Sequence, residues 1–176
     1  MAEELWFVDP SAGGNKTKVA LAPRPIDLVG KVVGLIDNTK EQADVILETI
    51  AHELKTRYGV KEVIIEKKEA FSKPATASQL DAMAKRVQLA AAAVGGCGSC
   101  TLCSVHDAVE FEKRGIPATV FLTSTFKNAA IHSFRAKGMD GHPFIELPHP
   151  ISNLTAEQMR VVTLGFVEQF VKQLTD

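Results

Sequence analysis

The sequence lacks the cysteine pattern of a secreted protein that disulfides stabilise. It has only three cysteines in 176 residues, and all three lie between positions 97 and 103. An extracellular disulfide framework usually has an even number of cysteines spread along the chain. Three cysteines in one short segment point instead to redox chemistry, nucleophilic catalysis or metal binding.

An excess of charge and long apolar runs are absent too. Lys and Arg total 20 and Asp and Glu total 21, a formal net charge of −1, so no basic field favours nucleic acid. The longest apolar stretch, residues 89–96, is too short to span a bilayer. The N-terminus also lacks the positive and apolar regions of a signal peptide. We expect a cytoplasmic protein that binds neither nucleic acid nor membranes.

The length predicts one domain preceded by an irregular arm, since a typical domain has roughly 150 residues. Residues 1–30 contain three prolines and three glycines, which interrupt regular structure. We interpret this arm either as a tail on the protein's own surface or as a clasp around a second copy in a homo-oligomer. Residues 31–176 are expected to form a single α/β domain.

Strand-like and helix-like segments alternate through this domain. Short β-branched or apolar runs predict strands at 31–37, 62–66, 89–96, 117–123 and 143–147. Apolar residues at helical spacing predict a helix after each strand. The expected helices run from Thr39 to Tyr58, from Ser78 to about Val87, from the cysteines to Gly115, from Ser124 to about Lys137 and from Thr155 to Leu174.

This alternation predicts a flavodoxin-like (Rossmann-like) three-layer sandwich with a five-stranded parallel sheet of order 2-1-3-4-5. In such sheets ligands bind at the carboxyl ends of the strands, where the strand order reverses. That point lies between the first and third strands. They end in Asp37-Asn38-Thr39 and in Gly95-Gly96-Cys97, so the cysteine cluster falls where the topology places an active site.

The cysteine loop has the layout of a redox pair. Gly95, Gly96 and Gly98 allow a tight strand-to-helix turn and leave room for a substrate. Cys97 would precede a helix, whose amide groups and dipole lower the pKa of a thiol. Cys100 follows one helical turn later. This spacing predicts a nucleophile and a resolving cysteine that together form a disulfide.

Two other interpretations of the cluster remain open. Cys97, Cys100, Cys103 and His106 recur at steps of three, as metal ligands can. On one helix, however, such residues spread over about two turns, and an iron–sulfur cluster normally needs a fourth cysteine. We expect no metal site. Cys103, deeper in the helix, is equally well explained as a buried packing residue.

Six segments carry a family resemblance: 96–101, 104–108 and 114–117, together with 21–25, 35–38 and 148–150. Their motifs resemble those of the UGSC family of selenoproteins and their cysteine homologues. The resemblance covers most of the chain, and Cys97 stands where the family's selenocysteine would be. It is also similar, more distantly, to selenoprotein B of glycine reductase, in which a selenium nucleophile attacks a substrate carbon. The resemblance implies thiol chemistry on a small molecule.

Other polar residues are candidates around this loop. We expect Asp37 and His149 to take part in catalysis by transferring protons, although a turn or helix-cap role explains Asp37 equally well. Cys103, His106 and Asp107 are auxiliary candidates. The predicted substrate-binding residues are Asn38, Thr39, Gly95, Gly96, Gly98, Ser99, Thr101 and Ser124.

The sequence thus predicts a thiol-dependent oxidoreductase that acts on a small electrophilic substrate. We expect no bound cofactor, and an external thiol or a thioredoxin-like partner protein as reductant. A flavin is disfavoured because the turn from Asp37 to Glu41 lacks a Ser/Thr/Gly-rich phosphate cradle. Two alternatives stay open: redox-neutral cysteine catalysis by a lyase, hydrolase or racemase, and a non-enzymatic redox sensor or thiol-presenting subunit.

Overall fold

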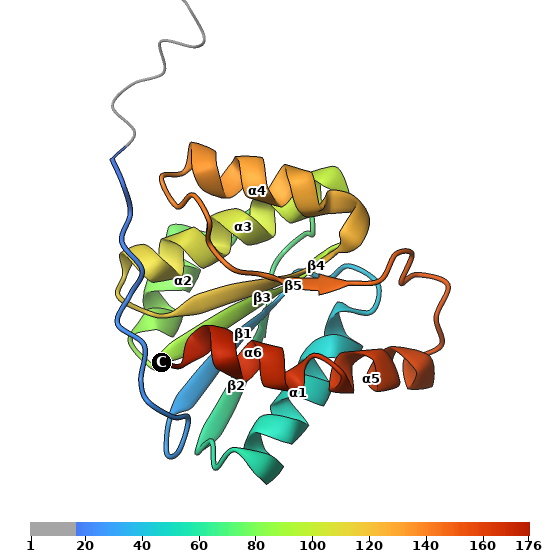
Figure 1. Cartoon of the computed structure of the whole chain (residues 1–176), viewed down its shortest axis with the longest axis horizontal. Helices are drawn as coiled ribbons and strands as arrows, with labels where there is room; N and C mark the ends of the chain where they lie inside the picture. The colour runs from blue at the N-terminus through green and yellow to red at the C-terminus, as the bar shows by residue number, and fades with distance from the viewer. Residues whose placement is uncertain (1–16) are drawn as a thin grey trace, which may run out of the picture.

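The computed structural model describes residues 17–176 and has a single parallel sheet at its centre (Figure 1). The strand order is β2-β1-β3-β4-β5, and every neighbouring pair is parallel. The predicted fold class and strand order are therefore confirmed, and the order reverses between β1 and β3. The strands are β1 (Val32–Asp37), β2 (Glu62–Lys67), β3 (Leu89–Gly95), β4 (Ala118–Thr123) and β5 (Ile145–Leu147).

Helices cover both faces of the sheet and complete three layers (Figure 1). One face packs against α1 (Ala43–Arg57), α5 (Ala156–Leu164) and α6 (Val167–Leu174). The other packs against α2 (Ala77–Ala84), α3 (Gly98–Lys113) and α4 (Lys127–Ala136). Alanines of β3 contribute alternately to the two cores, because successive side chains of a strand point to opposite faces.

The predicted helix starts were wrong in three places. Thr39 does not cap α1, because the helix begins four residues later, after Gln42, which adopts a left-handed conformation. The cap of α2 is Thr76 rather than Ser78, and its hydroxyl accepts a hydrogen bond from Gln79 N–H. Ser124 begins a short 3₁₀ turn, Ser124–Phe126, and caps nothing with its side chain.

The last predicted helix is interrupted. Thr155 caps its start with a reciprocal capping box, as the sequence suggested. The helical pattern then divides at Gly165 and Phe166 into α5 and α6. Glycine is among the weakest helix formers, and the division lets Phe170 of α6 stack on Phe121 of β4.

The described part of the arm, residues 17–30, contains no helix or strand. It packs against the α/β domain of the same chain. Ala22 N–H donates to Glu112 of α3, and Arg24 makes a buried ion pair with the same carboxylate at 2.7 Å. Val19 N–H donates to Gly138 O. The rest of the predicted arm, residues 1–16, lies outside the described residues, and its role as a clasp stays a prediction.

Across residues 17–176 no helix combines the length and the apolar character needed to cross a membrane.

Candidate functional site

The cysteine pair sits where β3 passes into α3, beside the point at which the strand order reverses. Cys97 has an extended backbone and is the N-cap of α3, with its Sγ accepting a hydrogen bond from Cys100 N–H at 3.2 Å. The Cα atoms of the two cysteines are 5.4 Å apart, and their sulfurs are paired as a disulfide. The predicted pair is therefore present.

The two cysteines differ in exposure. Cys97 is half-buried and Ser99 Oγ lies 3.6 Å from its sulfur, whereas Cys100 is fully buried. Thr101, a predicted substrate-binding residue, is also fully buried and donates to Cys97 O at 2.7 Å. Thr101 therefore stabilises the conformation of the loop. Of the four side chains from Cys97 to Thr101 other than Gly98, only those of Cys97 and Ser99 are accessible to an incoming molecule.

The three glycines of the loop have different roles. A Cβ on Gly95 would lie 2.7 Å from Thr101 Oγ1 and 2.9 Å from Leu122 Cβ. Its missing side chain thus lets α3 approach the sheet, and leaves no room for a substrate. A Cβ on Gly98 would meet nothing within 4 Å, and one on Gly96 would lie 3.8 Å from Lys40 Cε. The space that the sequence predicted lies at Gly96 and Gly98.

The loop after β1 forms the other wall. Asp37 and Asn38 are buried, and each accepts a backbone hydrogen bond from two residues on, Asp37 Oδ1 from Thr39 N–H and Asn38 Oδ1 from Lys40 N–H. Asn38 Nδ2 also donates to Val94 O of β3. These are the turn roles that Asp and Asn often have. They fix Thr39 at a positive φ of 64° and so set the direction of the chain at Lys40.

A small cavity of about 70 Å³ lies between this loop, Gly96 and the segment after β5. It borders Gly96, the residue that precedes Cys97. Lys40 and His149 are its two side chains that can carry positive charge. Lys40 could not be identified from the sequence, because no residue pattern marks which side chain of a loop borders a cavity. The lining residues are Lys40, Glu41, Gly96, His149, Ile151 and Ser152.

Thr123 at the end of β4 holds His149. Its hydroxyl lies 3.0 Å from His149 Nδ1 and 3.4 Å from Gly95 O. The ring also meets the edge of Phe126, with 5.8 Å between centroids. The structure thus places His149 at the cavity, and its part in catalysis stays a prediction. The sequence did not single out Thr123 and pointed instead to its neighbour Ser124. Ser124 is exposed and forms no side-chain hydrogen bond among the described residues.

The auxiliary candidates lie farther along α3. Asp107 is fully buried, pairs with Lys68 Nζ at 2.8 Å and accepts Ala75 N–H. Burial raises the pKa of Asp107, and Lys68 offsets this only in part. These contacts give Asp107 a structural role, because they fasten the loop after β2 to α3.

Burial also raises the pKa of the free Cys103 thiol, which makes it a poor nucleophile at neutral pH. Burial and the nearby Lys137 lower the pKa of His106, whose Nδ1 is 3.3 Å from Lys137 Nζ. Within residues 17–176 no group of three or more His, Cys, Asp or Glu side chains is arranged to hold a metal ion.

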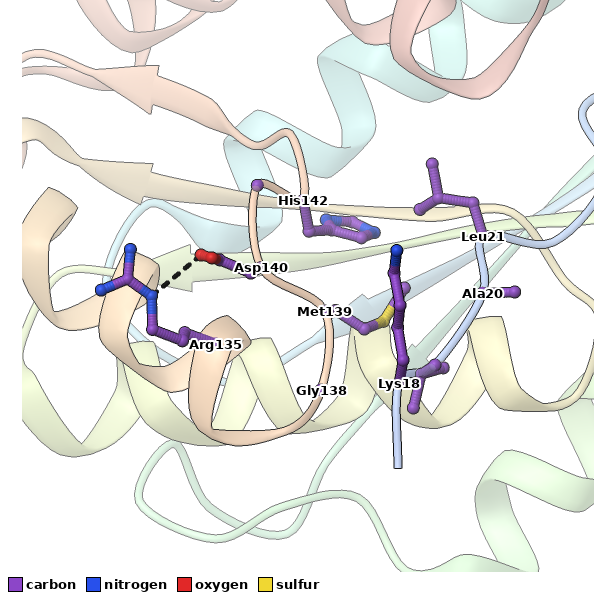
Figure 2. A pocket seen from close by; sticks show the side chains of 10 residues that line it. Lys18, Ala20, Leu21, Arg135, Gly138, Met139, Asp140 and His142 are labelled. Atoms are coloured by element: carbon purple, nitrogen blue, oxygen red, sulfur yellow. Dashed lines mark hydrogen bonds and ion pairs between the residues drawn. The ribbon is translucent and has the colours of Figure 1, made fainter. Parts of the chain in front are cut away.

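A larger cavity of about 780 Å³ lies elsewhere, between the arm and the loop that precedes β5 (Figure 2). Its lining includes Lys18, Leu21 and His142. Because loops that precede parallel strands lie at the amino edge of the sheet, this cavity is at the edge opposite the cysteines. The smaller cavity, which borders the cysteine loop, is therefore the candidate site.

Two solved structures are similar to this chain at low sequence identity. A diflavin flavoprotein A3 from Nostoc sp. is 13% identical, with a TM-score of 0.45, and the match covers 82% of this chain and 96% of that one. A protein assigned as a MAR1 ribonuclease from Leishmania major is 15% identical, with a TM-score of 0.37, covering 84% and 92%. Neither likeness bears on what this chain does.

No curated protein matches the sequence. The model of the UGSC family matches residues 7–176. The match includes both walls of the site, from Asp37 in the loop after β1 to His149 after β5. It confirms the family that the sequence motifs indicated, and the chain belongs to the UGSC family.

Proposed function

We propose that this protein is a thiol-dependent oxidoreductase in which Cys97 attacks a small electrophilic substrate and Cys100 resolves the adduct. The observation that carries the proposal is the pairing of a half-buried Cys97 with a buried Cys100 at the start of α3. A cysteine at a helix N-terminus faces amide N–H groups, which stabilise the thiolate form. The exposed member is the nucleophile, and the buried member is reached only through it.

The reaction proceeds in two steps. The Cys97 thiolate bonds to the electrophilic atom of the substrate, and a leaving group departs with its electron pair. The Cys100 thiolate then attacks Cys97 Sγ. The bond between that sulfur and the substrate atom breaks, and the released product keeps the electron pair and takes up a proton. The two cysteines lose two electrons as they form the disulfide, and the substrate gains them.

An external dithiol, such as a thioredoxin-like protein, restores the two thiols. It attacks Cys97 Sγ, because Cys100 is buried. This cycle suits a cytoplasmic protein, since the reducing pool of that compartment keeps thiols available. The more distant resemblance to selenoprotein B of glycine reductase supports a covalent adduct on the nucleophile, here formed on sulfur instead of selenium.

His149 is the proton carrier in this proposal. In this proposal the Thr123 hydroxyl donates its proton to Gly95 O and therefore accepts a hydrogen bond from His149 Nδ1–H. The neutral ring then has its lone pair on Nε2. Nε2 takes the proton from the Cys97 thiol and returns it to the departing product. Thr123 acts as a positioning residue that selects this tautomer.

The experiment uses an aromatic disulfide that releases a coloured thiol. Reduced wild-type protein should release two coloured thiols per chain and end with the Cys97–Cys100 disulfide, as intact mass shows. Cys100→Ser should release one and keep the other as a mixed disulfide on Cys97. Cys97→Ser should react many times more slowly, because Cys100 is buried.

A Cys97→Ser variant that reacts as fast as the wild type would overturn the proposal. Turnover of a cellular small molecule by Cys100→Ser at the wild-type rate would establish redox-neutral catalysis by Cys97 in its place. A change of thiol state in wild-type protein without turnover of any substrate would establish a sensor. The wild-type protein and Cys100→Ser together thus distinguish the two alternatives that the sequence left open.

A further inference from the structure

The cavity next to Gly96 is lined by a cationic residue, Lys40, that the proposed function does not use. Lys40 is half-buried, and its Cε lies 3.8 Å from the position that a Cβ on Gly96 would occupy. The side chain therefore runs beside the residue that precedes the nucleophile. Its Nζ stands 5.4 Å from the ring centroid of Phe71. Among the described residues, no carboxylate forms an ion pair with it.

The acidic groups near Lys40 do not neutralise it. Asp37 is buried and faces Lys67 Nζ at 3.5 Å. Glu41 lines the same cavity but is exposed, so water screens its charge more than that of the half-buried Lys40. Inside the cavity the positive charge of Lys40 therefore outweighs the negative charge of Glu41.

We propose that Lys40 binds an anionic group of the substrate, and that the site selects small carboxylates carrying an electrophilic atom. This inference rests on the proposed function of Cys97. The cavity of about 70 Å³ has room for only a few non-hydrogen atoms. A carboxylate group fits that size, and Ser152 and His149 add hydrogen-bonding side chains to the lining. The Lys40 ammonium would then orient the reacting carbon or sulfur toward Cys97.

The test compares two alkylating reagents that differ in charge. Iodoacetate carries a carboxylate, and iodoacetamide is its neutral counterpart of nearly the same size. The measured quantity is the ratio of the two rate constants for alkylation of Cys97 in the reduced protein. Mass spectrometry of the peptide that contains Cys97 gives each rate constant. A change in the reactivity of the thiol itself alters both rates and cancels in the ratio. The ratio therefore reports only how the cavity treats the charge of the reagent.

Lys40→Gln should lower the iodoacetate-to-iodoacetamide ratio by about fivefold, which is what one unit charge contributes at close range in a largely aqueous setting. Lys40→Arg keeps the charge and should retain the ratio. Glu41→Gln should raise it. Lys73→Gln makes the same chemical change at a lysine outside the cavity that is paired with Glu69, and should leave the ratio unchanged.

High salt gives an independent readout, because screening should move the wild-type ratio toward that of Lys40→Gln. An unchanged ratio in Lys40→Gln overturns this inference and leaves the proposed function standing. A fall of the same size in Lys73→Gln also overturns it, since the effect would then be one of net charge. Failure of Cys97 to react with either reagent overturns the proposed function and the inference together.

Discussion

The residues around Cys97 divide into those that hold the loop and those that face the cavity. The first group includes Asp37, Asn38 and Thr101. These side chains are buried and form hydrogen bonds with nearby backbone groups. Lys40 and His149 line the cavity. Three of the residues predicted at the strand ends, Asp37, Asn38 and Thr101, therefore hold the backbone of the loops, and their predicted part in catalysis or substrate binding stays a prediction.

Gly95 is the residue at which this positioning role is easiest to measure. Gly95→Ala should destabilise the protein by about 1–3 kcal/mol, because the new methyl group would push against Thr101 and Leu122. Gly98→Ala is the matched control. A Cβ there meets open space at the first turn of α3, where alanine is a good helix former, so the variant should be at least as stable as the wild type. Urea unfolding of both variants makes the comparison, and equal stabilities would contradict it.

At the scale of elements, the strands and their order followed from the sequence because β-branched and apolar runs are strong local signals. The helix starts did not. Thr39 has the side chain of an N-cap, but the hydrogen bonds from its own N–H to Asp37 and from Lys40 N–H to Asn38 turn the chain away from a helix there. Lys40 could not be identified from the sequence for a related reason, because its place at the cavity depends on Gly96 and His149, which are distant in sequence.

The ion pair between Lys68 and Asp107 joins two elements around the site. Both side chains are almost fully buried, and the pair fastens α3 to the loop that carries Phe71. Lys68→Met should cost about 3–5 kcal/mol of unfolding free energy, because it leaves the Asp107 carboxylate buried without its partner. The double variant Lys68→Met/Asp107→Leu should recover most of that loss. Denaturant unfolding of the wild type, Lys68→Met and the double variant measures these free energies. A double variant no more stable than Lys68→Met would show that the unpaired carboxylate does not cause the loss of stability.

At the scale of the whole molecule, Glu112 of α3 joins the arm, β4 and the loop before β5. Its carboxylate accepts hydrogen bonds from Ala22 N–H, Arg24 and Ala118 N–H, and His142 Nε2 lies 3.2 Å away. Burial alone would raise the pKa of Glu112. The hydrogen bonds outweigh burial and lower this pKa from 4.5 to about 2.

This lowered pKa predicts how stability depends on pH. A carboxyl group whose pKa is lower in the folded state stabilises the protein fully above its unfolded pKa of 4.5 and loses that contribution as the pH falls toward 2. The loss amounts to about 3 kcal/mol, as an order of magnitude. Unfolding by urea between those pH values should show a steeper decline for the wild type than for Glu112→Gln, which has no carboxylate to protonate. Parallel declines would contradict this role.

The central claim, that Cys97 is the nucleophile and Cys100 resolves its adduct, is tested most directly by alkylation of the reduced wild-type protein. The reagent is iodoacetamide. Mass spectrometry of the cysteine-containing peptides gives the alkylation rate of each cysteine between about pH 5 and 9. We predict that Cys97 reacts with a midpoint well below the value of about 8.5 for a free thiol, and that Cys100 and Cys103 react far more slowly. A Cys97 that alkylates no faster than Cys100, or only above that value, would contradict the account.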